Sequence, residues 1–200
     1  DRFCEILARI GYFVSIHDHR GHGRSVPEGG TYGYFADKDG FHLVVEDLHT
    51  ILTTLRLEHE LPRPIIFGHS MGSFITRRYI QLYSEAVEAV ILSGSGVANA
   101  LHVTGHQLAK VLVKTQGPKV KAYLMTSLSF GSFNKKFPNA RTAFDWMTRD
   151  STFVQAYMDD PLCGFVSTNQ FFVDLTGGLL LLSKDAEVAK VRKDLPVLFI

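Results

Sequence analysis

Gly68-His69-Ser70-Met71-Gly72 decides the fold of this chain, because it reads G-x-S-x-G where a strand-like segment gives way to a helix-like one. Residues 64–67 before it form a short apolar run, and residues 74–82 after it have helical spacing. A strand, a tight turn and a helix that meet at a serine project its hydroxyl from the end of a sheet. We therefore predict that Ser70 is a nucleophile.

The four neighbours of Ser70 have separate expected roles. Gly68 and Gly72 let the strand and the helix pass close together, because neither residue carries a side chain. The backbone N–H of Met71 lies at the first turn of the helix, where it faces a developing oxyanion. His69 cannot be the general base for Ser70, because the turn points adjacent side chains apart. We interpret His69 as a packing and hydrogen-bonding residue beneath the turn.

The composition is that of an ordinary globular protein, with 46% hydrophobic and 20% charged residues. A net charge of +1 gives no indication of a nucleic-acid surface or an acidic partner. Cys4 and Cys163 form neither a disulfide framework nor a metal-type spacing, which fits a reducing compartment and predicts a cytoplasmic location. The apolar run 177–182 is too short to span a bilayer. No signal peptide opens the chain, and residue 1 is not Met, so the true start is not visible.

Strand-like and helix-like segments alternate through the first half of the chain. Helical stripes are expected at 3–10, 41–55 and 74–84, strands at 12–16, 65–67 and 87–92, and a long loop at 17–40. This alternation predicts an α/β fold, a mostly parallel sheet flanked by helices on both faces. We assign residues 1–96 to the core of that domain.

The alternation stops between residues 97 and 192. The pattern there is mostly helical, with breaks at 117–118, 131 and 160–161, and we interpret it as a helical cap inserted above the sheet. Its many phenylalanines have two interpretations of equal weight, the core of the cap or the lining of an acyl-chain site. Phe171 and Phe172 are the candidates for such a lining. Residues 193–200 return to strand character and to the core sheet.

Residues 17–22 read His-Asp-His-Arg-Gly-His, which is close to the ligand pattern of binuclear zinc hydrolases. Gly21 stands where that pattern needs an aspartate ligand, and no later His or Cys has a matching context. We therefore expect no metal. The better interpretation is a turn in which Gly21 and Gly23 allow tight backbone and polar side chains hold loops together.

Three segments together resemble the α/β-hydrolase fold: Asp18-His19-Arg20-Gly21-His22-Gly23-Arg24-Ser25, Gly68-His69-Ser70-Met71-Gly72, and Leu92-Ser93-Gly94. Within that fold the chain is most similar to the monoacylglycerol lipase and lysophospholipase branch. Residues 139–150 and 160–165 resemble the cap of bacterial members. The resemblance implies a serine hydrolase of carboxylic esters with an acyl-enzyme on Ser70, no cofactor, and a small lipid ester as substrate.

The resemblance also implies what lies outside these residues. The catalytic triad of the family runs Ser, then Asp or Glu, then His. The acid would follow the strand that begins at Pro196 and the His would come later, so neither is expected in this chain. The second oxyanion donor would precede Asp1. His102 and His106 are the only histidines after Ser70, and we favour exposed cap or loop positions for both.

Two other functions remain open from the sequence. One is a different chemistry on the same fold, such as a prolyl aminopeptidase or a cofactor-free haloperoxidase. The other is a non-catalytic binding domain that keeps the fold without a full triad. Among partners we expect no nucleic acid, and at most a transient contact of the cap with a membrane surface. The pattern predicts no oligomeric state.

Overall fold

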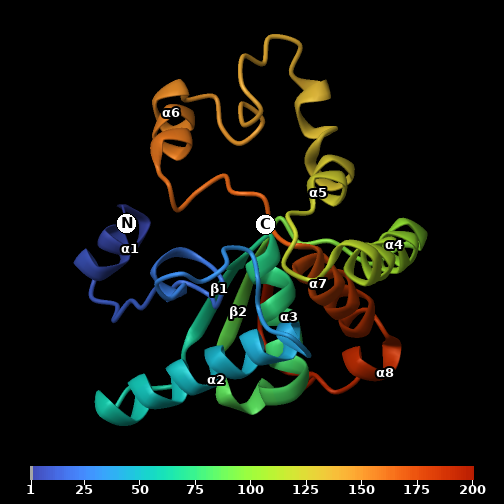
Figure 1. Cartoon of the computed structure of the whole chain (residues 1–200). Helices are drawn as coiled ribbons and strands as arrows, with labels where there is room; N and C mark the ends of the chain where they lie inside the picture. Colours follow the sequence, from blue (N-terminus) through green and yellow to red (C-terminus); the bar gives the residue numbers. More distant parts are fainter. Residues whose placement is uncertain (1) are drawn as a thin grey trace.

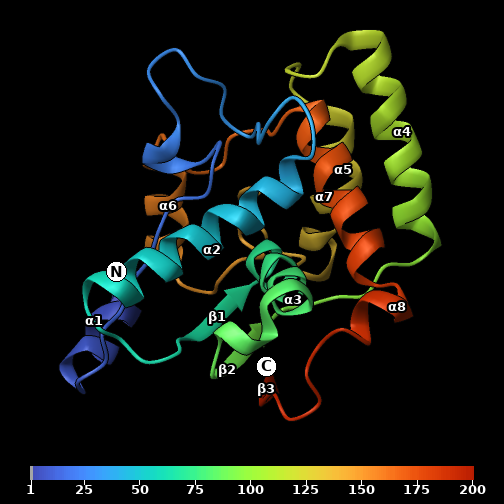
Figure 2. The ribbon, with the colours of Figure 1, turned by 90° about the horizontal axis from the view of Figure 1, so that it is seen from below.

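The computed structural model describes residues 2–200, and at their centre lies a three-stranded parallel sheet (Figures 1 and 2). Its strands are β1 (Ile65–His69), β2 (Ala89–Ser93) and β3 (Val197–Phe199), in the order β1-β2-β3. Val90 in the middle strand pairs with Ile66 on one side and Val197 on the other. The carboxyl ends of parallel strands share one edge, so the turn after β1 and the loop after β2 are neighbours.

Helices lie on both faces of this sheet, but they cover one face much more fully than the other. On one face lie α2 (Gly40–Glu58) and α3 (Met71–Tyr83), which pack against each other and, through α3, against β1 and β2. Alternate strand residues such as Ile66 and Leu92 are buried on this side. On the other face α1 (Arg2–Arg9) places Phe3 with its ring 5.3 Å from that of Phe67.

A second helix pair extends the core beyond the sheet. The most extensive interhelical contact joins α4 (Ala100–Gln116) to α7 (Asn169–Leu182), and α7 also packs on α2 and α3. One core cluster therefore contains residues from the loop before α2, from the helices α2, α3, α4 and α7 and from β1 and β2, and it also includes Met125 of the helix at 123–130. Its most enclosed members are the following: Tyr79, Ile75, Leu92, Leu182, Val44, Val45, Val87 and Val90. The short helix α8 (Asp185–Val188) follows α7 and leads toward β3.

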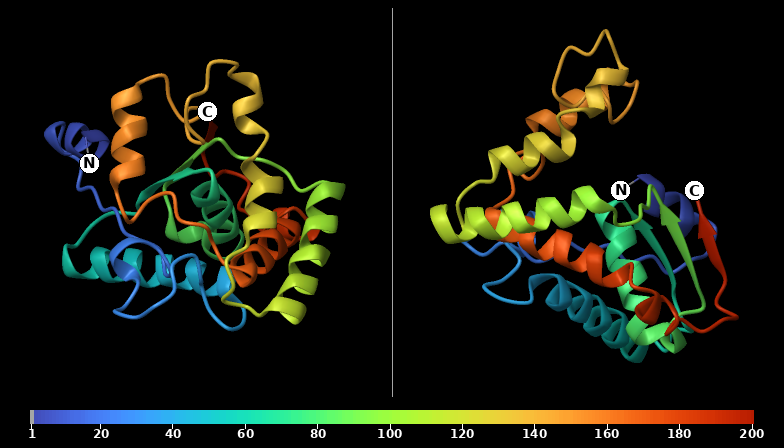
Figure 3. Two further views of the ribbon diagram at one scale, coloured as in Figure 1. Left: turned by 45° about the horizontal axis from the view of Figure 1, so that its top comes forward. Right: turned by 90° about the vertical axis from the view of Figure 1, so that its right-hand side faces the viewer.

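We call residues 123–165 the arm and the remaining described residues the body. The arm stands out from the body (Figure 3). The arm contains α5 (Tyr123–Phe130), a 3₁₀ turn at Phe133–Lys136 and α6 (Ser151–Asp159). Its two ends are joined by a short antiparallel neck, in which Lys121 is bridged to Thr168 and the Ala122 N–H donates to the Ser167 carbonyl. The strands run toward the end of the body from which the arm rises (Figure 3).

Most of the expected elements are present at the expected places. The helices begin or end at the predicted breaks, with α4 ending at Gln116, α5 at Phe130 and α6 at Asp159. The strand expected at residues 12–16 is wrong, because this segment has no ladder partner among residues 2–200 and joins no sheet. The loop predicted at 17–40 holds one 3₁₀ turn (Gly23–Ser25), and another (Ser84–Ala86) follows α3. Across the described residues no helix combines the length and apolar character that a bilayer crossing requires.

Candidate active site

Ser70 occupies a strained turn between β1 and α3. Its backbone has φ 49° and ψ −115°, a region that residues with a side chain rarely adopt. Such a conformation costs about 1–3 kcal/mol and persists only where the surrounding structure enforces it. Ser70 is exposed, so its hydroxyl is accessible at the carboxyl edge of the sheet. The predicted strand–turn–helix geometry is therefore present.

The close approach of strand and helix is made at Gly68. A Cβ atom on Gly68 would lie 2.5 Å from the Thr76 hydroxyl oxygen and 2.6 Å from the Gly72 carbonyl oxygen. Both distances are far below van der Waals contact, so only glycine fits at Gly68. The close approach that we also expected at Gly72 is not present among the described residues, because a Cβ on Gly72 would meet no atom within 4 Å.

Backbone hydrogen bonds fix the turn from both sides. The Ser70 N–H donates to the Ser93 carbonyl at the end of β2, with an N···O distance of 2.9 Å. The Ser70 carbonyl accepts the Ser73 N–H at 2.9 Å and the Ser73 hydroxyl at 2.6 Å. Met71 is the first residue of α3, and the first N–H groups of a helix have no intrahelical acceptor. The Met71 N–H is thus suited to receive an oxyanion next to Ser70, the role predicted for it.

His69 lies beside Ser70 but is directed to β2. Its Nδ1 atom is 3.0 Å from the Ser93 hydroxyl oxygen, and the residue is exposed. This contact agrees with the hydrogen-bonding role expected for His69. Because the residue is exposed, the packing role beneath the turn is not supported by the described residues. Ser93 therefore contacts the turn twice, through its carbonyl to Ser70 and through its hydroxyl to His69.

The two later histidines are engaged on α4. His102 forms a capping box with Asn99, whose N–H donates to His102 Nδ1 at 3.1 Å. His106 Nδ1 lies 2.9 Å from the Thr176 hydroxyl oxygen on α7, and burial lowers the pKa of His106. Among residues 2–200, no histidine is hydrogen-bonded to the Ser70 hydroxyl. That the general base lies outside these residues therefore stays a prediction.

The loop after residue 16 is organised by a carboxylate and two glycines. Asp18 accepts the Arg24 N–H, and its carbonyl accepts the Ser25 hydroxyl. Gly23 has φ 49°, and a Cβ on it would lie 2.3 Å from the Asp18 carboxyl carbon. Gly21 has φ 72°, and a Cβ there would lie 2.3 Å from the Tyr34 carbonyl oxygen. The predicted tight backbone is what the structure shows in this loop.

The histidines of this loop contact each other and the core. His17 Nε2 is 3.2 Å from His19 Nδ1, and the His22 ring lies 5.5 Å from that of Phe165. Burial, followed by repulsion from His17 and His22, lowers the pKa of His19 to about 4. Burial also lowers the pKa of His17 and of His22. Over the described residues, no group of three or more His, Cys, Asp or Glu side chains is arranged to hold a metal ion.

The contacts of Arg20, Asp47 and Asp174 near this loop were not predicted from the sequence. Arg20 binds Asp47 of α2 through two hydrogen bonds, of 2.6 and 2.7 Å, and so attaches the loop to the body. Asp174 of α7 is buried against Gly40 at the start of α2, and burial raises its pKa to about 6. The available signal was an acidic residue within an otherwise apolar helix stripe, which is costly unless it has a partner.

Phe171 and Phe172 lie on α7 inside the main core. They are 6% and 2% exposed, and the Phe171 ring is 4.9 Å from that of Phe35. Two hollows are formed by arm residues instead, and neither phenylalanine lines them. A role of Phe171 or Phe172 in lining an acyl site stays a prediction.

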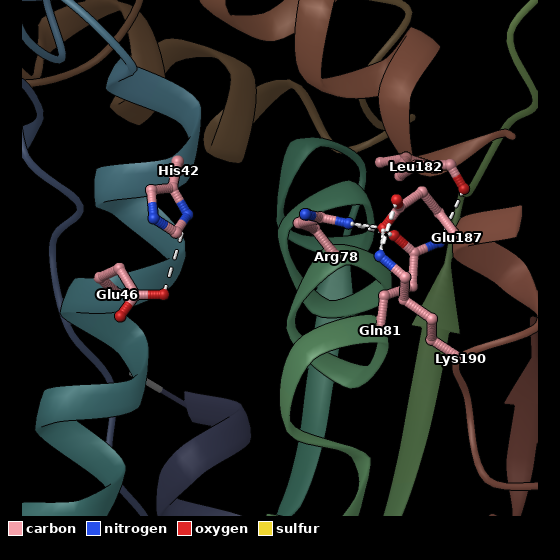
Figure 4. A network of polar contacts seen from close by, with 7 residues as sticks. All are labelled: His42, Glu46, Arg78, Gln81, Leu182, Glu187 and Lys190. Atoms are coloured by element: carbon pink, nitrogen blue, oxygen red, sulfur yellow. Dashed lines mark hydrogen bonds and ion pairs between the residues drawn. The ribbon is translucent and has the colours of Figure 1, made fainter.

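A polar network attaches α8 to the helix that follows the turn (Figure 4). Arg78 of α3 donates to Glu187 at 2.5 Å, and Glu187 also accepts Lys190. Gln81, one turn further along α3, donates to the carbonyl of Leu182 at the end of α7 (Figure 4). The network holds the segment that leads into β3 against α3, whose first residue forms the candidate oxyanion site.

The sequence matches one family model along its whole length. The model describes the serine aminopeptidase, S33, group of hydrolases, and it covers residues 1–200. The chain belongs to this family. With the strained turn at Ser70, the parallel sheet and the flanking helices, this membership identifies the α/β-hydrolase fold.

Two curated relatives carry related names. The chain is 34% identical over 166 residues to a monoacylglycerol lipase of Mycolicibacterium smegmatis, a match that covers 80% of this chain and 51% of the relative. It is 24% identical over 162 residues to a monoglyceride lipase of Rattus norvegicus, covering 81% of this chain and 46% of the relative. The chain thus spans about half the length of the curated relatives it matches.

A solved structure supports the fold independently. The thermostable carboxyl esterase of Bacillus coagulans in complex with glycerol superposes with a TM-score of 0.79 at 23% sequence identity. The superposition covers 90% of this chain and 58% of the esterase. At this identity the likeness establishes the α/β-hydrolase fold, and the sheet, the turn and the helix order described above agree with it.

Proposed function

We propose that the whole protein is a serine hydrolase of carboxylic esters, with Ser70 as its nucleophile. The observation that supports this most directly is the backbone of Ser70, held at φ 49° and ψ −115° at the start of α3. A strained, exposed serine at the end of a parallel strand is the arrangement that nucleophilic catalysis on this fold requires. The family membership and the names of the relatives point the same way.

The proposed reaction has two steps. The Ser70 oxygen bonds to the ester carbonyl carbon while its proton passes to a histidine base, and the carbonyl oxygen becomes an oxyanion that the Met71 N–H stabilises. The C–O bond to the alcohol then breaks, the alcohol takes the proton, and an acyl-enzyme remains. Water, deprotonated by the same base, hydrolyses the acyl-enzyme to the free acid. The base and its acid partner belong to parts of the whole protein outside residues 2–200 in this proposal.

For the substrate we propose a monoacylglycerol or a lysophospholipid. The printed names of two relatives support a lipid ester, and the exposed apolar side chains of the arm suit a protein that meets lipid. We place the protein in the cytoplasm, with a transient contact of the arm with a membrane surface. No cofactor takes part in this scheme.

A peptidase activity is the second candidate, because the family model is described by a serine aminopeptidase. The same acyl-enzyme chemistry cleaves an amide when the amine is protonated as it leaves. A panel of p-nitrophenyl esters and aminoacyl amides, assayed on the whole protein, separates the two candidates. Turnover of the amides alone would replace the ester proposal.

The nucleophile is tested with Ser70→Ala in the whole protein. We expect turnover to fall by about six orders of magnitude, the scale found when a triad nucleophile is removed. Fluorophosphonate labelling should disappear in the same variant, while Ser127→Ala on α5 should label normally. Near-normal esterase activity in folded Ser70→Ala protein would refute the assignment. Because no described histidine is hydrogen-bonded to the Ser70 hydroxyl, residues 1–200 expressed alone should not be labelled. Rapid labelling would make His102 and His106 the first bases to test.

A further inference from the structure

The arm carries two adjoining hollows of different chemistry. The larger, of about 460 Å³, has an apolar wall formed by Met147, Phe153 and Tyr157. The smaller, of about 330 Å³, lies on the other side of Thr148 and Val154, which line both hollows. Both hollows are open to solvent, so a ligand in either would be partly covered and partly exposed.

The smaller hollow is cationic. Lys136, Arg141 and Arg149 line it, against the single carboxylate of Asp145. That carboxylate already accepts the Thr142 hydroxyl and the Arg141 N–H, and these hydrogen bonds lower the pKa of Asp145. Arg141 is only loosely paired with it, at 3.7 Å. Within residues 2–200, neither Lys136 nor Arg149 forms an ion pair, so both are available to an anion.

The larger hollow is suited to a hydrocarbon chain. The Phe153 side chain is 60% exposed and that of Met147 is 42% exposed, so apolar surface on the arm faces solvent. Val154 is nearly buried at the shared wall. One carboxylate, that of Asp160, also lines this hollow, and it accepts the Leu162 N–H at 2.8 Å. Covering the apolar wall is favourable by about 25 cal/mol per Å² of surface removed from water.

We propose that the arm binds a single-chain anionic amphiphile, with the chain in the larger hollow and the head group in the smaller. The argument is the complementarity of charge and polarity across one shared wall. None of these lining residues belongs to the turn at Ser70, so this site is separate from the residues assigned to ester cleavage. A carboxylate or a phosphate head group fits the same three cations. A fatty acid, the acidic product of ester cleavage, has this chemistry.

The chain supplies its own probe for this site. Trp146 is the one tryptophan in the sequence, it directly precedes Met147, and its ring lies 4.8 Å from that of Phe133 on the arm. We would titrate the chain with ω-bromododecanoate below its critical micelle concentration, because a bound bromine quenches nearby tryptophan. Saturable quenching is expected. Dodecyl phosphate should compete for the site, and the two head groups can then be ranked.

Two comparisons define the expected result. Dodecanoate should bind about fourfold more tightly for each methylene by which it exceeds a shorter acid. It should also bind at least about tenfold more tightly than neutral monododecanoylglycerol, because charge-assisted hydrogen bonds are lost with the neutral head group. Lys136→Glu with Arg149→Glu should weaken dodecanoate about tenfold or more, whereas Lys135→Glu, a neighbour that lines neither hollow, should change affinity less than twofold.

Other outcomes overturn the proposal. Equal affinity for the acid and the neutral ester, or no response to the double charge reversal in protein with unchanged circular dichroism, would exclude the cationic hollow. Quenching that appears only with anionic vesicles and never with monomeric probe would assign the arm to membrane adsorption instead. Ser70→Ala should bind the probe normally, so failure of the ester-cleavage proposal and failure of this one give different results.

Discussion

The body and the arm differ in how deeply they bury aromatic side chains. Phe172 on α7 is 2% exposed inside a core shared with α2 and α3, whereas Phe153 on α6 is 60% exposed. Each arm helix has one buried residue, Met125 in α5 and Val154 in α6, against eight in α7. The arm therefore leaves much apolar surface in water, and contiguous apolar surface in a soluble domain commonly marks a binding site.

This contrast separates the scaffold from the surface that meets ligands. The turn at Ser70 needs a rigid body, because its backbone strain persists only where the ladder of β1 with β2 and the packing of α3 enforce it. The arm is connected through the neck at Lys121 and Thr168. Substitutions at exposed arm positions should consequently alter ligand contacts while the stability of the body is unchanged, whereas Met125 of α5 belongs to the shared core.

The largest stability difference between the two regions is expected at matched phenylalanines. Phe172→Ala should lower the free energy of unfolding by about 3–5 kcal/mol, because it removes a buried ring and leaves a cavity. Phe153→Ala should change it by less than about 0.5 kcal/mol, as for other exposed positions. Urea denaturation followed by circular dichroism measures both. Similar losses at the two positions would mean that the arm folds back and shares the core.

The next effect concerns the two glycines of the turn. Gly68→Ala should destabilise the chain by about 1–3 kcal/mol, because its new methyl group meets the Thr76 hydroxyl and the Gly72 carbonyl. Gly72→Ala meets open space within α3 and should stabilise the helix by up to about 1 kcal/mol. Thermal unfolding of both variants gives the comparison. A loss of stability in Gly68→Ala with a gain in Gly72→Ala supports the close approach at Gly68. Equal losses of stability in both variants would indicate that Gly72 contacts a part of the protein outside the described residues.

The pattern of the sequence predicted local secondary structure better than it predicted which segments pair with each other. Glycine and proline breaks placed the ends of α4, α5 and α6, since those residues act on their own backbone. The segment 12–16 has strand character, but a strand also needs a hydrogen-bonding neighbour, and none is present among the described residues. Pairing depends on residues distant in the chain, which periodicity does not report.

The same limit applies to the candidate site. The turn at Ser70 was predictable, because the strand, the glycine and the helix that create it are contiguous. The pattern also indicated mostly helical structure between residues 97 and 192, yet it does not say which surface covers the apolar residues of these helices. Phe171 and Phe172 could thus be expected in a cap, whereas α7 packs on α2 and α3. The contact of Arg20 with Asp47, which spans 27 residues, was beyond prediction for that reason.

The last expected effect is a change of pH dependence at Asp174, where the body buries a carboxylate. Its side chain accepts Gln170 Nε2 at 3.0 Å, its other oxygen faces Gly40, and the like charge of Asp39 is nearby. Burial, the main cause, raises its pKa to about 6 in the folded protein, against about 3.9 when unfolded. The folded state therefore holds this proton more tightly than the unfolded state does. The contribution of Asp174 to stability is then greatest below about pH 4, falls as the pH rises toward about 6, and stays low above that.

Asp174→Asn tests this contribution, because the amide resembles the protonated carboxyl group at every pH. The variant should be more stable than the native chain at pH 7, and the difference between them should vanish as the pH falls through the interval between the two pKa values. Denaturant midpoints measured at several pH values across that interval show whether it does. Asp159→Asn on the arm, an exposed carboxylate, is the matched control and should leave the pH profile unchanged. A loss of stability in Asp174→Asn at pH 7 would mean that the charged carboxylate is stabilised at the start of α2, and that the first N–H groups of this helix outweigh the cost of burial.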